Sequence, residues 1–364
     1  MTGEAETAAA AAASPEPVGA GGGRGIAGAL AGALAPVVLA LVAGGLVLVA
    51  LGVDPLEFYA NVVRRGLLSY LGLQATITRM APLLLLGAGL IVAFRAGLWN
   101  LGVDGQFILG AVMTAALSPL LLQVMPNWLM VVVMLLIAAA VGALWSVIPA
   151  LLKAYYAINE IITTLMMSFL ALSLANLLIK VVFRDPSSTA PETAVLPVVE
   201  RLPRLFGTTI HAGVPLALVV LLLVHFVMTR TAFGLRVQVV GANPKAAIHA
   251  GLDVPLLSLA VFALSAGLAG LAGGVEILGV WGTMRADWNP AYGLMIVPLV
   301  FLARFNGIAL VGFVFFFAVL SIGGETASRK ADIPNDFLLV LVALVLAFLA
   351  MTEYLMLRCQ QRRR

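Results

Sequence analysis

The chain has 364 residues, of which 62% are hydrophobic and only 10% are charged, and its formal net charge at pH 7 is +4. A soluble domain carries about 25% charged residues, so this composition excludes a protein with a fully water-facing surface. The small positive excess gathers at Arg358 and 362–364, which favours the anionic inner face of a bilayer over nucleic acid as its partner. The one cysteine, Cys359, excludes a disulfide framework and a cysteine-based metal site.

The mean hydropathy of +1.09 and repeated uncharged runs of membrane-spanning length predict spanning helices. A transmembrane β-barrel would instead alternate apolar and polar residues over short segments. Runs such as 216–228 and 311–322 do not alternate. The sequence therefore predicts an all-α polytopic membrane protein.

The first 27 residues are rich in Ala, Gly and Pro, which predicts a disordered N-terminal tail. The apolar stretch 29–52 after Arg24 is too long for the apolar region of a signal peptide, so we interpret it as the first span. The further apolar segments are about 80–95, 105–123, 128–152, 159–182, 213–229, 255–275, 292–303, 308–324 and 337–357. About ten transmembrane helices are expected within a membrane domain at 28–357.

Several of these segments are near or below the ~20 residues that a perpendicular helix needs to cross a bilayer. Short, Gly-interrupted segments are typical of the broken helices that transporters place near the membrane midplane. Residues 97–110 can also be aligned with 267–279, and each segment carries an acid near its middle. If this is an internal repeat, two related halves meet near the midplane.

Two long polar connections differ in character. The Pro-rich residues 183–212 predict an irregular external loop. Residues 229–254 predict a basic cytoplasmic loop that contains a two-turn helix, with Asn243 as N-cap, Pro244 as first helical residue and Gly251 after its end.

An even number of spans places both termini on the same side of the membrane. Counted over such a topology, eleven of the 21 Lys and Arg residues fall on the side of the termini, which is nearly an even division. The basic clusters at 230–245 and 358–364 lie beside span ends, where the positive-inside rule has most force. This favours cytoplasmic termini, with 358–364 as a basic cytoplasmic tail.

Charges within apolar segments are the strongest functional signal, since a charge at a helix centre costs about 2.5–3.5 kcal/mol on insertion scales. Arg95 and Asp104 flank 97–102, a segment poorly suited to a continuous helix. Either Arg95 extends to the membrane surface and Asp104 caps the next helix, or Asn100, Asp104 and Gln106 sit at a break that faces a translocation path. Backbone groups freed at such a break need polar partners, so these side chains can cap a helix and line a path at the same time.

Two further acids lie at or within spans. Glu160 starts an apolar helix, where the positive N-terminal dipole favours a carboxylate. Glu276 lies between glycines and either lines a pathway or has a structural role. We interpret the small residues around it as sites of close helix packing rather than of ligand binding; they are Ser265, Gly267, Gly270, Gly273 and Gly274.

Enzyme signatures are missing from the sequence. There is no Gly-x4-Gly-Lys-[Ser/Thr] loop and no His-Glu-x-x-His, and His211, His225 and His249 are far apart in sequence. The sequence therefore predicts neither a cofactor nor a metal site, and an intramembrane enzyme is the third-ranked class. Energy for transport has to come from an ion gradient or from another subunit.

Four segments, taken together and in order between about residues 76 and 355, resemble one family. Gly97-Leu-Trp-Asn-Leu-Gly-Val-Asp-Gly-Gln106 resembles the Asn-Ile-Gly-x-Glu-Gly-Gln signature of ABC permeases for nucleosides and simple sugars. Residues 159–166 resemble the Asn-Glu-Val-Ile-x-Thr-x-Met helix start of these permeases. Residues 265–273 also fit the sequence pattern of the family. Residues 231–247 resemble their cytoplasmic coupling loop. Asp104 stands where the family usually has Glu, and Ser168 where Asn is common.

The resemblance implies a permease subunit in a bacterial plasma (inner) membrane that works by alternating access. Its partners would be two cytoplasmic ATP-binding subunits, a second permease copy or homologue, and an extracytoplasmic solute-binding protein. The implied substrate pathway residues are Asn100, Asp104, Gln106 and Glu276. The implied residues for coupling to the ATPases are Gly241, Asn243, Pro244, Ala246, Ala247 and Gly251.

Two alternatives stay open. Permeases for branched-chain amino acids have a different first signature and rank second. An ion-coupled secondary transporter could use Asp104 or Glu276 as its ion site, but it would not need an exposed basic loop with a capped helix.

Overall fold

The computed structural model describes residues 26–334 and several further residues between 337 and 352. Nearly all of the tail predicted at 1–27, the basic tail at 358–364 and Cys359 lie outside the described residues. The described part is almost entirely helical, and the extended pairing within it is limited to two isolated β-bridges. Seven of its helices are long and apolar enough to cross a membrane. The all-α polytopic fold is confirmed.

The described α-helices begin and end as follows: α2 Ile26–Ala50, α3 Pro55–Val63, α4 Tyr70–Arg95, α5 Val103–Leu121, α6 Asn127–Trp145, α7 Val147–Tyr156, α8 Glu160–Leu177, α9 Gly213–Arg230, α10 Ala232–Ala242, α11 Pro244–His249, α12 Val254–Glu276, α13 Tyr292–Leu302 and α14 Gly307–Lys330. Three π-helical segments, η1 Arg64–Leu68, η2 Leu178–Val182 and η4 Ile277–Trp281, extend α3, α8 and α12.

One span begins well before its predicted start. The sequence predicts an apolar segment from residue 80, but α4 begins at Tyr70, after the short helix α3 that the sequence analysis did not identify. The early turns of α4 contain Gln74, Thr76 and Arg79, which lower their hydropathy. Gln74 and Thr76 are nevertheless buried, because tertiary partners satisfy their polar groups.

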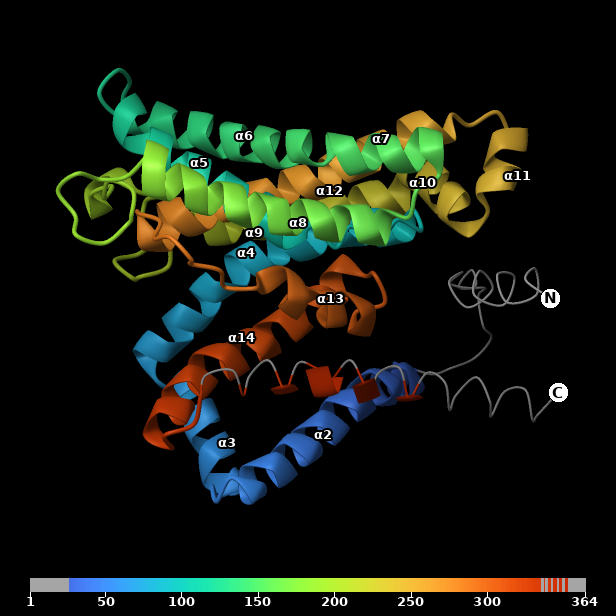
Figure 1. The fold of residues 1–364 in the computed structure, drawn as a ribbon. Helices are drawn as coiled ribbons and strands as arrows, with labels where there is room; N and C mark the ends of the chain where they lie inside the picture. The colour runs from blue at the N-terminus through green and yellow to red at the C-terminus, as the bar shows by residue number, and fades with distance from the viewer. Residues whose placement is uncertain are drawn as a thin grey trace.

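The larger region of the molecule is a bundle centred on α12, which packs against α4, α5 and α6 (Figure 1). Its small residues allow the backbones to come close together. A Cβ added at Gly270 would meet the carbonyl oxygen of Ala138 on α6, and one at Gly273 would meet that of Phe107 on α5. The predicted role of this stripe in close helix packing is confirmed.

The two segments proposed as an internal repeat differ in local structure. Residues 97–102 form a non-helical connection between α4 and α5, whereas 267–276 lie within the continuous helix α12. The segments pack against each other, since a Cβ at Gly110 would meet the backbone of Gly270. The backbones therefore differ at 97–102 and at the residues of α12 aligned with them.

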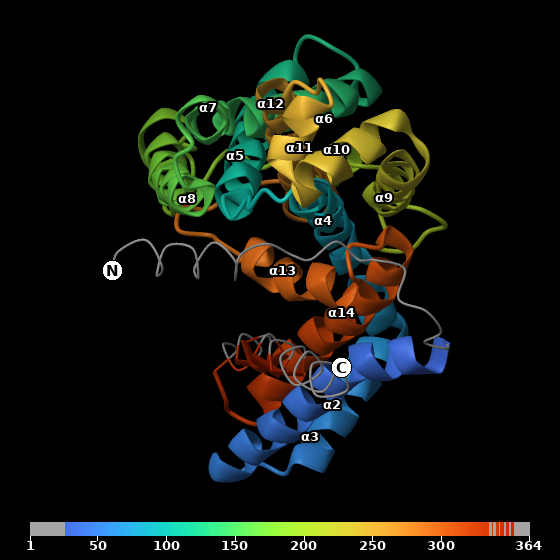
Figure 2. The same ribbon diagram turned by 90° about the vertical axis from the view of Figure 1, so that its right-hand side faces the viewer.

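A smaller region is formed by α2, α3 and α14, and Figures 1 and 2 show it to one side of the main bundle, with α13 between the two. Helix α14 packs against both α3 and α4 and so joins the regions. A separate apolar cluster holds the far end of this region together; it contains Leu48, Phe58, Val62, Ala327, Phe337 and Leu341.

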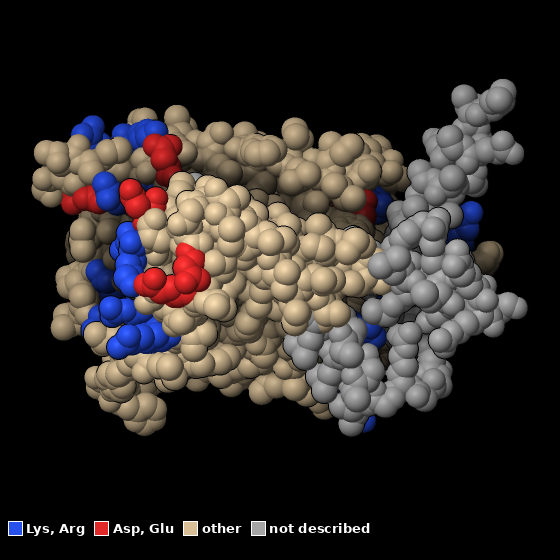
Figure 3. Space-filling model, turned by 90° about the horizontal axis from the view of Figure 1, so that it is seen from below, with Lys and Arg blue, Asp and Glu red and all other residues tan. Residues whose placement is uncertain are grey.

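The 183–212 connection is irregular, as predicted, and has only the short 3-10 helix η3 Val198–Glu200. It is held against the segment after α12, because Thr193 N donates to Met284 O at 3.0 Å and Leu196 N donates to Gly282 O at 2.8 Å. Thr209 N donates to Gln74 Oε1 at 2.7 Å, so the start of α4 lies at the same end of the molecule. Figure 3 shows charged side chains gathered at this end, beside a broad surface largely free of them.

Candidate functional site

The helix break predicted at 97–102 is present inside the bundle. Helix α4 ends at Arg95, Gly97 has a φ of +69°, and α5 begins at Val103. Asn100 Nδ2 donates to Ser265 Oγ at 3.0 Å, and Ser265 lies eleven residues past the start of α12. At 1.5 Å per residue this is about 16 Å along α12, so the break lies within the depth of a spanning helix.

The amides of Asn100 and Gln106 pair reciprocally across the break. Asn100 Nδ2 donates to Gln106 Oε1 at 2.9 Å, and Gln106 Nε2 donates to Asn100 Oδ1 at 3.0 Å. Both side chains are buried. A buried amide pair of this kind fixes the shape of the break, because each polar group left alone would cost free energy.

Asp104 caps a helix, but not its own. Although it lies in the first turn of α5, its Oδ1 accepts from Gly293 N in the first turn of α13 at 2.6 Å. A carboxylate at a helix N-terminus satisfies free N–H groups and is favoured by the helix dipole. The two chain segments are almost two hundred residues apart, so Asp104 ties the break to the start of the short helix α13.

Glu276 lies at the end of α12 and is 3% exposed. Its Oε1 accepts from Tyr292 Oη and from Trp281 Nε1, both at 3.1 Å, whereas its buried Oε2 has no hydrogen-bond partner. Tyr292 begins α13, directly before the residue that Asp104 caps. Both predicted acids therefore lie at the N-terminal end of α13.

A group of charges that the sequence analysis did not single out completes this site. The guanidinium of Arg79 lies 5.6 Å from the centre of the Tyr292 ring and forms an ion pair with Glu325 at 3.3 Å. We name Arg79, Glu276, Tyr292 and Glu325 the Arg79 network; it joins α4, α12, α13 and α14. The sequence contained one signal for this network, because Arg79 is a charged residue directly before the apolar segment predicted at 80–95. Its partner Glu325 lies just beyond the segment predicted at 308–324.

Arg95 and Glu160 have structural roles. Arg95 donates to Met228 O near the end of α9 at 3.2 Å and to Phe305 O at 3.0 Å, so it lies at a helix end and binds free carbonyl groups. Glu160 begins α8, as predicted, and forms an ion pair with Lys153 Nζ at 2.8 Å. The sequence analysis did not identify Lys153 as the partner.

The helix predicted in the 229–254 loop is α11, and its N-cap is confirmed, because Asn243 Oδ1 accepts from Ala246 N at 3.0 Å. Pro244 is its first residue, and Gly251 follows its end with a φ of +78°. Ala247 is fully buried, whereas the other residues of α11 are exposed. Helix α11 therefore forms an exposed projection at one end of the molecule (Figure 1).

The same loop makes a direct backbone contact with the helix break. A Cβ added at Gly241, near the end of α10, would meet the carbonyl oxygen of Arg95, and one added at Gly97 would lie 3.3 Å from Gly241 O. The connection from α10 into α11 therefore lies against the entrance to 97–102.

Among the described residues, no three His, Cys, Asp or Glu side chains lie together in a group that could hold a metal ion. His211, at the end of the 183–212 loop, is fully buried and accepts from Gly213 N through Nδ1 at 3.1 Å. Burial, with a smaller contribution from the charge of Arg204, lowers the pKa of His211 to about 4. The imidazole is therefore neutral at pH 7.

Residues 72–351 match the protein family described as branched-chain amino acid transport system / permease component. The glucose ABC transporter permease protein TsgB13 of Haloferax volcanii is 34% identical over 87% of this chain and 86% of its own. The guanosine ABC transporter permease protein NupP of Bacillus subtilis is 28% identical over 87% and 92%. The nucleoside ABC transporter permease protein NupB of Lactococcus lactis subsp. cremoris is 26% identical over 87% and 89%. No solved structure matches the chain.

Proposed function

The chain belongs to the family of branched-chain amino acid transport system permease components and is the membrane-spanning permease subunit of an ABC importer, and we propose that it carries a nucleoside or a simple sugar. It is a multi-pass membrane protein and a transport subunit rather than a catalytic one. The proposed solute rests on the names of its relatives, which are permeases for glucose, guanosine and nucleosides. A branched-chain amino acid is the second candidate, because the family description names that class.

Uptake in proteoliposomes tests the solute class. The permease would be reconstituted with its ATPase subunits and its solute-binding protein and supplied with radiolabelled glucose, guanosine or leucine. We expect ATP-dependent accumulation of glucose or guanosine. Accumulation of leucine alone would place the chain among amino acid permeases, and uptake that follows an ion gradient without ATP would contradict the ABC mechanism.

The association with ATPase and substrate-binding components follows from the family. The proposed assembly has two permease copies or homologues, two ATPases on the cytoplasmic side and one binding protein on the opposite side. In this arrangement α11 and both termini are cytoplasmic, and 183–212 is external. The exposed basic Lys245 on α11 supports this orientation.

Reporter fusions test the orientation. The structure favours an internal insertion between Phe206 and Gly207, because Phe206 is 98% exposed and a Cβ at Gly207 would meet nothing within 4 Å. A reporter that works only in the cytoplasm should be active after Arg364 and silent at 206–207. The reverse pattern would place α11 outside the cell, where an ATPase cannot reach it.

The proposed coupling element is α11 with the residues around it. Its motion would pass from Gly241 to the main chain at 95–97 and then to the Asn100–Gln106 pair. Asp104 connects that break to the start of α13, beside Glu276. The contact between Gly241 and Arg95 is the observation that carries this proposal, because it joins the end of α10, which leads into α11, to the end of α4 at the break.

We assign the pathway to the vicinity of Asn100, Asp104, Gln106 and Glu276. In the described conformation Asn100 and Gln106 contact each other, and Asp104 and Glu276 both contact the start of α13. Alternating access would separate these contacts in one of the two states and expose their polar groups to the solute.

A further inference from the structure

The segment 282–291, between η4 and α13, is irregular and runs into the depth of the membrane domain. Its first residues are hydrogen-bonded to the 183–212 loop. Its far end lies at the helix break, because Gly293 N donates to Asp104 Oδ1 at 2.6 Å. Asp104 is seventeen residues before Leu121, the last residue of α5, or about 25 Å along that helix. The segment therefore connects the end that carries the loop with the level of the break (Figure 1).

Polar side chains along this segment are exposed. The side chains of Arg285 and Asp287 are 70% and 71% exposed, and Asn289 is exposed as well. Irregular backbone and charged groups at membrane depth are tolerated only where protein covers them or where they line a water-filled space. Because these side chains are not covered, the segment faces water rather than hydrocarbon.

Two tryptophans contact each other at this segment. Trp281 ends η4 directly before it, and Trp288 lies within it; their ring centres are 5.7 Å apart in an edge-to-face arrangement. Trp288 also packs against Phe107 on α5, with the ring centres 6.1 Å apart. Trp281 is nevertheless 46% exposed, so nearly half of its surface is open to contact with another molecule.

The hydrogen bond of Trp281 distinguishes it from a tryptophan that anchors a span at the membrane surface. Anchoring tryptophans place the apolar ring in the bilayer and direct the N–H towards water or headgroups. Trp281 Nε1 instead donates to Glu276 Oε1 at 3.1 Å, and Glu276 is 3% exposed. Glu276 is therefore a positioning residue, which fixes an indole ring whose exposed part is largely its apolar surface.

We propose that Trp281, Trp288, Asp287 and Asn289 form the outer entrance of the transport path and bind the solute there by stacking on its ring. This proposal rests on the transport function proposed above. Aromatic side chains stack on the face of any base, and their apolar surface also fits the C–H face of a sugar ring. The carboxylate of Asp287 accepts hydrogen bonds from hydroxyl groups, and the amide of Asn289 donates to them. The entrance therefore fits a ring that carries hydroxyl groups, which guanosine and glucose share and leucine lacks.

Thiol labelling tests whether this entrance contains water. Cys359→Ser removes the one native cysteine, and Asn289→Cys is then treated with a membrane-impermeant maleimide in right-side-out vesicles. Val132→Cys is the control, because Val132 is 49% exposed on the apolar helix α6. We expect labelling at 289 to be at least tenfold faster than at 132. No labelling at 289, or equal rates at the two positions, would overturn the proposal.

Saturation-transfer NMR of the full chain in nanodiscs tests the contact with the ring. Glucose, guanosine and leucine are added in turn, and saturation of the protein signals is detected on the solute. We expect transfer to the ring protons of glucose or guanosine and none to leucine. Trp281→Leu should weaken this binding about tenfold through the loss of stacking. Trp128→Leu should leave it unchanged, since Trp128 lies at the start of α6 and is 69% exposed.

Two further variants carry the test if Trp281→Leu does not fold once Glu276 has lost a partner. Trp281→Phe keeps a ring without the N–H, and Trp288→Leu removes the neighbouring ring without removing a hydrogen bond to Glu276. Thermal unfolding shows which variants are folded, and each folded variant should bind about threefold more weakly than the wild type. Wild-type affinity in both variants would contradict binding by stacking.

Uptake in proteoliposomes separates this entrance from the proposed function. We expect the solute that binds the wild-type permease to be the one that is taken up. Uptake of glucose or guanosine, together with equal binding by Trp281→Leu and Trp128→Leu, would overturn the entrance alone. Uptake of leucine alone would overturn both the entrance and the proposed class of solute.

Discussion

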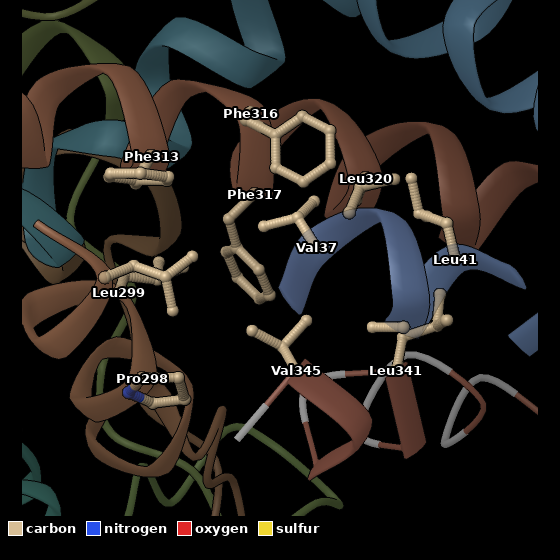
Figure 4. A pocket seen from close by; sticks show the side chains of 12 residues that line it. Val37, Leu41, Pro298, Leu299, Phe313, Phe316, Phe317, Leu320, Leu341 and Val345 are labelled. Atoms are coloured by element: carbon tan, nitrogen blue, oxygen red, sulfur yellow. The ribbon is translucent and has the colours of Figure 1, made fainter. Parts of the chain in front are cut away.

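The two regions of the molecule differ in how their helices meet. In the larger bundle α12 lies so close to α5 and α6 that a single added Cβ at Gly270 or Gly273 would meet backbone atoms, and the polar groups at its break are paired. In the smaller region α14 approaches α3 just as closely, since a Cβ at Gly323 would meet Val62 O, whereas α2 and α14 face each other across a small apolar pocket (Figure 4). Because protein interiors are closely packed, a larger residue at one of these glycines has to displace a neighbouring helix.

The strongest test of this difference is a bulky residue at a glycine in each region. Gly270→Leu should destabilise the fold by about 3 kcal/mol or more, because its Cβ meets the carbonyl of Ala138 and neither helix can move away freely. Gly312→Leu on α14 is the matched control, since a Cβ there meets nothing within 4 Å. Thermal unfolding in detergent measures both variants, and equal losses would contradict the packing difference.

A double-mutant cycle tests the ionic contact that joins the regions. Arg79→Met leaves Glu325 without its partner and should cost about 3 kcal/mol of stability. The double variant with Glu325→Gln should be less destabilised than the two single effects added together, with a coupling energy of about 1–3 kcal/mol. Additive effects would show that the Arg79 network does not hold α4 to α14.

The pH dependence of stability tests the loop that covers the larger bundle. Because the pKa of His211 is lowered to about 4, the unfolded chain takes up a proton below about pH 6.5 while the folded chain does not. His211 should therefore make stability fall as pH decreases from 6.5 towards 4. His211→Asn keeps an acceptor for Gly213 N and should flatten this part of the profile. Identical profiles for the wild type and His211→Asn would show that His211 titrates normally.

The smallest effect is expected at an exposed ion pair on the surface of the bundle. Lys180 and Asp287 lie 3.1 Å apart, and their side chains are 46% and 71% exposed. Solvent screens such a pair, so Lys180→Ala should change the free energy of unfolding by no more than about 0.5 kcal/mol. A larger loss would show that the 282–291 segment depends on this contact.

Local features of the fold could be predicted from the sequence because their causes are local. Asn243 and Pro244 specify the start of α11 by capping and by a fixed φ, and the glycines of α12 mark its close contacts. The start of α4 was predicted ten residues too late, because hydropathy counts Arg79 as a charge whatever its partner. The partner of Arg79 is Glu325, which lies on α14, more than two hundred residues further along the chain.

The composition of the candidate site was only partly predictable for the same reason. The sequence shows that Asp104 and Glu276 are acids in apolar surroundings, and both lie at the start of α13. It does not show that Asp104 caps a helix far along the chain, or that Tyr292 and Arg79 join Glu276. These contacts depend on how the spans pack, which no short motif encodes.

A substitution on the exposed surface of α11 tests most directly whether this helix receives the motion of the ATPases. Ala247 is buried, so a bulky residue there would disturb the seating of α11, whereas Ile248 is 59% exposed and can face a partner. Ile248→Glu and the conservative Ile248→Leu would be compared for thermal stability, ATP hydrolysis and solute uptake in proteoliposomes.

We expect Ile248→Glu to keep the stability of the wild type and to lower uptake about tenfold or more, which corresponds to about 1.4 kcal/mol. Ile248→Leu should transport at close to the wild-type rate. Wild-type uptake by a stably folded Ile248→Glu variant would contradict the coupling role of α11.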